Sequence, residues 1–180
     1  MRFTALPIAG ASLVEPEPIR DERGYFARVW SQEEFARQGL DSRAVQANIG
    51  VSDRRGTLRG LHYQVAPDLE AKLVRCLRGA VWDVLVDLRP DSPTFRQWHG
   101  VELAGGDGRS VYVPPLCAHG YITLEDDTEL WYQASAPYAA ASARGVRFDD
   151  PSLGIEWPCA VQVISDRDRE WPLLAPGGAS

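Results

Sequence analysis

Short runs of apolar residues, many of them β-branched or aromatic, alternate with turns from residue 43 onward. Runs of this kind, bounded by Gly, Pro and Asp, are typical of β-strands. The predicted strands cover residues 44–51, 56–64, 72–77, 80–88, 98–103, 110–114, 120–124 and 129–135. Seven or eight strands at this spacing predict a β-sandwich or barrel.

One segment, residues 31–39, is predicted to be a helix. Ser31 suits the N-cap, Glu34 stands three positions later as in a capping box, and Gly39 suits the C-terminal end. The chain has 180 residues, which predicts one domain over residues 1–180, with a core over about 15–172 and a frayed end at 173–180. The Pro-containing segment 13–19 would suit an edge strand or one exchanged with a partner.

The strand predicted at residues 80–88 is apolar on both faces, which indicates an internal strand. Asp83 lies in one of these apolar rows. Because a buried carboxylate is costly unless it is paired, Asp83 needs a partner, and a histidine is the obvious candidate.

The formal net charge of −6 argues against a general nucleic-acid surface. No apolar run is long enough to cross a bilayer, so no membrane partner is expected. Cys76, Cys117 and Cys159 form an odd set without CxxC spacing, and the first thirty residues lack a secretory pattern. These features predict a cytoplasmic protein.

Arg59, His62 and Lys72 crowd into one β-rich stretch, which suggests an anionic substrate and proton transfer. His62 could act as a general base, or it could be a buried histidine satisfied by hydrogen bonds. The other histidines, His99 and His119, do not stand at metal-site spacing with it, so no metal is expected.

Five motifs occur in an order that resembles the dTDP-4-dehydrorhamnose 3,5-epimerase family over residues 15–172. They are GTLRGLHYQ (56–64), EAKLVRC (70–76), PPLCAHGY (114–121), LWYQ (130–133) and DDPSLGIEWP (149–158). The resemblance implies an all-β, cupin-like jelly-roll sandwich with a few short helices, assembled as a homodimer. It also implies an isomerase that needs no cofactor and acts on a small-molecule nucleotide sugar.

The resemblance further implies a role for each matching residue. His62 would be the base and Asp168 its orienting carboxylate, Tyr132 the acid on the opposite face of the sugar, and Lys72 the cation that stabilises the enolate. His119 would pair with Asp83. The remaining matches are Arg23, Arg59 and Arg167 near the diphosphate or sugar, His119 at the substrate, and Gln46, Asn48 and Tyr138 at the nucleotide.

Without the resemblance, these residues have simpler interpretations. Tyr132 reads more readily as a core aromatic, Lys72 as a surface cation and Asp168 as one charge in the exposed run DRDRE.

Two departures from the family pattern leave the nucleotide and sugar open, because Arg28 and Ala143 stand where the family usually has glutamates. The segment 48–56 is also one residue longer than usual. A C3-only epimerase and a non-catalytic sugar-nucleotide-binding barrel remain as alternatives, while a metal-dependent cupin enzyme lacks ligands. The pathway, for rhamnose or for a secondary metabolite, is also open.

Overall fold

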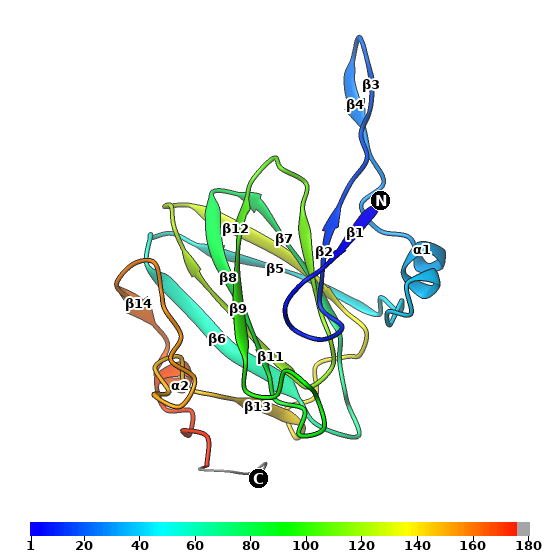
Figure 1. Cartoon of the computed structure of the whole chain (residues 1–180). Coiled ribbons are helices and arrows are strands. Elements are labelled where there is room, and N and C mark those ends of the chain that lie inside the picture. The colour runs from blue at the N-terminus through cyan, green and yellow to red at the C-terminus, as the bar shows by residue number, and fades with distance from the viewer. Residues whose placement is uncertain (176–180) are drawn as a thin grey trace.

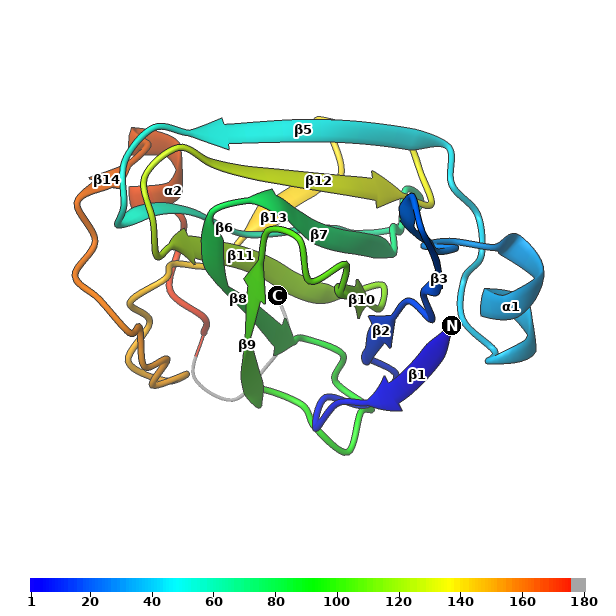
Figure 2. The same ribbon diagram turned by 90° about the horizontal axis from the view of Figure 1, so that it is seen from above.

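Two antiparallel sheets pack face to face in the computed structural model, which describes residues 1–175 (Figures 1 and 2). The first sheet has the order β1 (Arg2–Ala5), β2 (Ser12–Glu15), β10 (Ser110–Val113), β7 (Lys72–Arg78), β12 (Thr128–Ala134) and β5 (Gln46–Ser52). The second has the order β13 (Ala143–Gly145), β6 (Thr57–Gln64), β11 (Cys117–Thr123), β8 (Ala80–Asp87) and β9 (Trp98–Ala104). The short β14 (Val163–Ile164) runs parallel to β6. The predicted all-β jelly-roll sandwich is thereby confirmed.

All eight predicted strands are present, as β5 to β12 in chain order. β8 lies between β11 and β9, as its apolar faces predicted. The strands that the sequence did not reveal are short, namely β1, β3, β4, β13 and β14. The segment 13–19, expected to suit an edge or exchanged strand, contains most of β2, which lies between β1 and β10 and is therefore not an edge strand.

The predicted helix forms as α1 (Gln32–Arg37), and Ser31 Oγ accepts a hydrogen bond from the Glu34 N–H at 3.5 Å. The second half of the expected capping box is absent. The Glu34 carboxylate accepts hydrogen bonds from the Met1 amino group and from Arg28, both at 3.0 Å. A second helix, α2 (Asp166–Arg169), begins after Ser165, whose Oγ accepts a hydrogen bond from the Asp168 N–H at 3.1 Å.

Three apolar clusters hold the layers together. The central one fills the space between the sheets and includes Val74, Leu130, Leu85 and Val111. The outer face of the second sheet is covered by the segment that contains Val146 and Leu153. α1 packs its buried Phe35 against the outer face of the first sheet. The core therefore occupies one part of the sandwich interior and leaves another part open.

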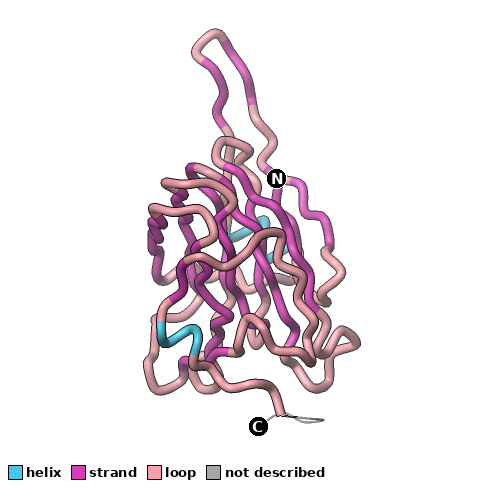
Figure 3. The backbone as a smooth tube through the Cα atoms, turned by 90° about the vertical axis from the view of Figure 1, so that its left-hand side faces the viewer, coloured by secondary structure: helices cyan, strands magenta, loops and turns pink. Residues whose placement is uncertain are grey.

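A hairpin of β3 (Ile19–Asp21) and β4 (Gly24–Phe26) projects away from both sheets (Figures 1 and 3). Its apolar side chains are unusually exposed, with 73% of Ile19 and 73% of Phe26 accessible to solvent. Burial of such apolar side chains stabilises a fold or an assembly. The described residues of this chain do not bury the apolar side chains of the hairpin.

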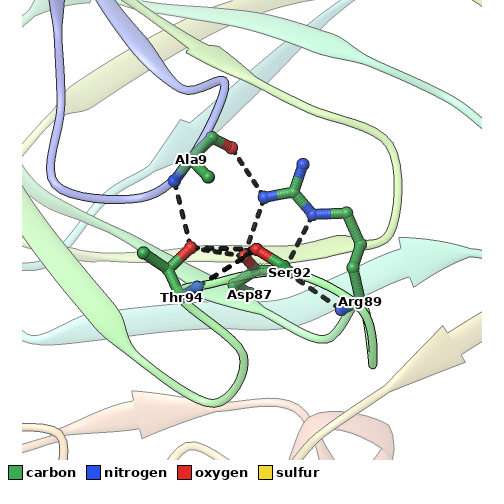
Figure 4. A network of polar contacts seen from close by, with 5 residues as sticks. All are labelled: Ala9, Asp87, Arg89, Ser92 and Thr94. Carbon is green, nitrogen blue, oxygen red and sulfur yellow. Dashed lines mark hydrogen bonds and ion pairs between the residues drawn. The ribbon is translucent and has the colours of Figure 1, made fainter.

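The buried carboxylate of Asp87 ties the N-terminal loop to the β8–β9 connection (Figure 4). It accepts hydrogen bonds from Arg89 at 2.7 Å, Ser92 at 2.5 Å and Thr94 at 2.6 Å. Thr94 and Arg89 in turn bond the backbone N–H and carbonyl of Ala9. The network fixes the loop that closes one end of the sandwich.

The end of the chain runs along the outer side of the second sheet. The Leu174 N–H donates to the Asp150 carboxylate at 2.6 Å, and the Ala175 carbonyl accepts a hydrogen bond from Arg96. The rest of the segment expected to be frayed, 176–180, lies outside the described residues. Within residues 1–175, no helix is long and apolar enough to cross a membrane.

Candidate active site

A cavity of about 580 Å³ lies between the two sheets. The first sheet contributes Ile49, Gly50, Lys72, Leu130 and Tyr132, the second contributes Thr57, Leu58, Arg59, His62, His119 and Tyr121, and the segment through β14 and α2 closes one side with Val163, Ile164, Ser165, Arg167 and Asp168. A smaller cavity of about 130 Å³ shares His62, Lys72, Tyr132 and Arg167 with it. Most of the residues implied by the resemblance therefore lie around one connected space.

His62 and Asp168 form a close pair at the edge of this space. The His62 Nε2 lies 2.6 Å from the Asp168 Oδ1, and the imidazole is 41% exposed while the carboxylate is 6% exposed. Burial by itself raises the pKa of Asp168, but hydrogen bonds from His62, the Gly60 N–H and Trp171 outweigh it and lower that pKa below its ordinary value. The carboxylate therefore stays ionised and orients an imidazole that faces the cavity, which is the arrangement of a general base.

The local backbone explains how Asp168 comes so close to β6. Gly60 has a φ of +132°, and a Cβ there would lie 2.5 Å from the Gly120 Cα on β11. Only glycine combines this backbone conformation with such a close approach. The backbone N–H of Gly60 donates a hydrogen bond to Asp168 Oδ2 at 3.3 Å. β14 runs beside β6 and brings α2, and with it Asp168, to His62.

Trp171 is a member of this group that the sequence did not reveal. Its Nε1 donates to the Asp168 Oδ1 at 3.3 Å, and its ring meets the His62 imidazole edge to face at 6.2 Å between centroids. The indole packs directly over Gly145, where a Cβ would lie 2.2 Å from it. The pattern DRDREWP carried no signal for this contact, because the segment's position depends on the pairing of β14 with β6.

A second histidine–aspartate pair lies next to the first, since His119 of β11 is the cross-strand neighbour of His62. The His119 Nε2 lies 2.7 Å from the Asp83 Oδ2, and the Asp83 side chain is fully buried. The predicted need of Asp83 for a histidine partner is confirmed. Within residues 1–175, no three His, Cys, Asp or Glu side chains are grouped so that they could hold a metal ion.

Tyr132 and Lys72 face the histidines from the opposite sheet, on β12 and β7. Burial raises the pKa of Tyr132 above its ordinary value, so its hydroxyl keeps its proton at neutral pH. The Lys72 Nζ lies 2.9 Å from Glu70 Oε1 and 3.4 Å from the His62 carbonyl oxygen. The His62–Asp168 pair and the protonated Tyr132 thus lie on opposite walls of the cavity.

Two of the three predicted arginines line the cavity and one does not. Arg59 donates to the Val51 carbonyl at 2.8 Å, and Arg167 lies over the Trp171 ring at 5.2 Å. Arg23 is in the projecting hairpin, 84% exposed, and bonds only Asp21 among the described residues. The structure therefore does not bring Arg23 to the site of its own chain.

The residues expected at the nucleotide line the smaller cavity. Gln46 bonds Asn48 at 3.1 Å and accepts from the Tyr138 N–H at 3.1 Å, while Asn48 Nδ2 is buried and has no partner within residues 1–175. Ala143 lies in the same wall. Arg28 lies elsewhere, bonded to Glu34 on α1, so of the two departures only Ala143 changes a cavity of this chain.

A jelly-roll sandwich with a histidine–aspartate pair and a protonated tyrosine on opposite walls of one cavity has the arrangement typical of a class, the acid–base enzymes that act on small molecules. A sequence model of the dTDP-4-dehydrorhamnose 3,5-epimerase family matches residues 5–176. The chain belongs to this family, and it is therefore an epimerase.

Individual relatives agree with this assignment. The chain is 43% identical to dTDP-4-dehydrorhamnose 3,5-epimerase of Sinorhizobium fredii, over 97% of this chain and 90% of the relative. It is 40% identical to dTDP-4-dehydrorhamnose 3-epimerase of Streptomyces niveus, over 97% and 84%. The crystal structure of dTDP-4-dehydrorhamnose 3,5-epimerase from Bacillus anthracis with TDP and PPi bound superimposes with a TM-score of 0.91 at 38% identity, covering 96% of this chain and 99% of that one.

Proposed function

We propose that this protein inverts C3 and C5 of dTDP-4-dehydro-6-deoxy-D-glucose to give dTDP-4-dehydro-L-rhamnose. The observation that carries the proposal is the placement of His62, paired with the ionised Asp168, and of the protonated Tyr132 on facing sheets across one cavity. The 4-keto group of such a sugar acidifies the neighbouring C–H bonds. Removal of a proton from one face of the ring and delivery to the other inverts the carbon.

Each side chain has a role in this reaction. His62 takes the proton from carbon and Asp168 orients the imidazole. Lys72 stabilises the negative charge that develops on the C4 oxygen, and Tyr132 returns a proton from the opposite wall. His119, held by Asp83, lies beside His62 and contacts the sugar.

Groups around the two cavities suit the rest of a nucleotide sugar. Arg59 and Arg167 offer guanidinium groups to the diphosphate. Gln46, Asn48 and Tyr138 form the base site, where the unpartnered Asn48 amide can donate to a base carbonyl. Ala143 removes an expected carboxylate from this wall, which motivates an alternative in which the site prefers another nucleotide. Calorimetric affinities for dTDP, CDP and GDP test the two: tightest binding of dTDP supports the proposed substrate and refutes the alternative.

We also propose a homodimer in which the projecting hairpin carries Arg23 to the partner's cavity. The support is the exposure of Ile19 and Phe26 on the hairpin, together with the distance of Arg23 from its own site. Further apolar side chains are exposed on the first sheet, namely Val51 and Leu77. The unpaired thiols of Cys76, Cys117 and Cys159 fit the reducing conditions of the cytoplasm, which we propose as the location.

Incubation with dTDP-4-dehydro-6-deoxyglucose in deuterium oxide, followed by proton NMR of the sugar, tests the reaction. We expect loss of both the C3 and the C5 proton signals. Loss of the C3 proton signal alone would favour the alternative, a C3-only epimerase. The similarity to the 3-epimerase of Streptomyces niveus motivates this alternative. A folded protein that exchanges neither proton would refute both.

A further inference from the structure

A carboxylate lies in the wall of a cavity that is otherwise suited to an anionic ligand. Glu70, in the connection before β7, lines the smaller cavity. Its Oε1 lies 2.9 Å from the Lys72 Nζ, and both side chains are only 11% exposed. A charge so far removed from water is costly and would also repel a diphosphate. Because the buried Glu70 carboxylate has these two costs, we expect it to contribute to the chemical step.

The first benefit is the placement of the Lys72 ammonium. A lysine side chain has four rotatable bonds and loses rotamer entropy when it is fixed. Glu70 and the His62 carbonyl hold the ammonium from two directions at 2.9 and 3.4 Å. A cation fixed in this way by the protein needs little reorganisation when charge develops on the substrate.

The second benefit concerns the proton on Tyr132. After burial, the Glu70 carboxylate is the next largest cause that raises the pKa of Tyr132, and Arg59 opposes it. The titratable and charged groups that share the cavities with this phenol are Glu70, Lys72, Arg59, His62, His119, Tyr63, Tyr121, Tyr138, Asp168, Arg167 and Arg144. Glu70 and Arg59 are the two whose charges act most strongly on it.

We propose that Glu70 is a positioning residue of this site, which acts through Lys72 and Tyr132 and does not itself touch the reacting atoms. This inference rests on the proposed function. It has a distinctive kinetic consequence, because the negative charge opposes the binding of an anionic substrate while it supports the chemical step. Loss of the charge should therefore lower kcat without raising KM.

Glu70→Gln tests the inference, since the amide keeps the shape of the carboxylate and removes its charge. We expect kcat to fall on the order of 10-fold, less than the roughly 10²- to 10³-fold loss when a stabilising donor is removed outright. KM should stay the same or fall. The alkaline limb of the kcat profile should move to lower pH, because the Tyr132 hydroxyl then loses its proton more easily.

The proton on Tyr132 can also be followed without turnover. Protein labelled with carbon-13 at the tyrosine Cζ is titrated by NMR, and Tyr132→Phe assigns the signal. Glu70→Gln should move the titration of Tyr132 to lower pH, and Glu70→Asp, which keeps the charge, should move it less. The control is Glu125→Gln, which makes the same change of charge at an exposed position after β11.

The outcomes separate this inference from the proposed function. An inactive wild type would refute the proposed function, and the NMR titration would still decide whether Glu70 acts on Tyr132. An active wild type whose kcat, alkaline limb and Tyr132 titration are unchanged by Glu70→Gln would overturn the inference. A raised KM with unchanged kcat would overturn it as well, because Glu70 would then bind the substrate.

Discussion

The Asp168→Asn substitution tests how much the reaction depends on the orientation of His62. Asp168 Oδ1 lies 2.6 Å from the His62 Nε2, and Oδ2 accepts the Gly60 N–H at 3.3 Å. An asparagine can present its oxygen to only one of these two groups. Either His62 or the Gly60 N–H then faces an amide NH₂.

The magnitude follows from the kind of hydrogen bond that is lost. A hydrogen bond to a charged group contributes about 1.5–3 kcal/mol, and because Asp168 is 6% exposed, water compensates little of the loss. If the whole contribution is made in the transition state, kcat falls about 10- to 150-fold. KM should change little, because the carboxylate faces the imidazole and not the substrate.

The assay is the initial rate of deuterium exchange at C3, with a thermal unfolding scan to confirm that the variant folds. Asp166→Asn, an exposed position on the same helix, is the matched control and should leave the rate unchanged. A folded Asp168→Asn protein with kcat within about 2-fold of wild type would refute the role assigned to the pair.

Three further predictions concern Trp171, Asp87 and Arg23. Trp171→Phe removes the 3.3 Å hydrogen bond to Asp168 but keeps an aromatic ring. Because this bond is long, it contributes about 0.5–1.5 kcal/mol, less than the short contact with His62, so kcat should fall about 2- to 13-fold at constant KM. Initial rates over a range of substrate concentrations measure both constants, and a changed KM would contradict the prediction. Burial opposes the charge of Asp87, but its hydrogen bonds lower its pKa from 3.8 to about 2. This carboxylate therefore stabilises the fold by about 2 kcal/mol above pH 4, and the contribution is lost as the pH falls toward 2. The difference in free energy of unfolding between wild type and Asp87→Asn, measured in urea, should narrow over this pH range. A constant difference would contradict the lowered pKa of Asp87. If the hairpin serves the partner's cavity, mixing His62→Ala chains with Arg23→Ala chains should restore intact sites in the heterodimers, whereas no gain on mixing would place Arg23 in its own site.

The strands that carry the site were predictable because local patterns determine them. Alternation and turn residues indicated β6, β8 and β12, and the isolated carboxylate of Asp83 in an apolar row indicated its histidine partner. These inferences need only the neighbouring residues.

The rest of the site depends on contacts between distant segments. Asp168 lies in a charged run that reads as exposed, and only the pairing of β14 with β6 brings it to His62, 106 residues away in the sequence. Trp171 is placed by the same pairing. Glu70 reads as one more surface charge until the smaller cavity closes around it. For Asp168 the resemblance supplied what the pattern could not, whereas Trp171 and Glu70 emerged only from the structure.

The central claim is that His62 removes the proton from one face and Tyr132 returns it to the other. The most direct measurement compares, for Tyr132→Phe, deuterium exchange at C3 with formation of the inverted sugar, both by NMR in deuterium oxide. The account predicts that exchange persists while inversion is lost, and that His62→Ala abolishes both. Full inversion by the Tyr132→Phe protein would contradict it.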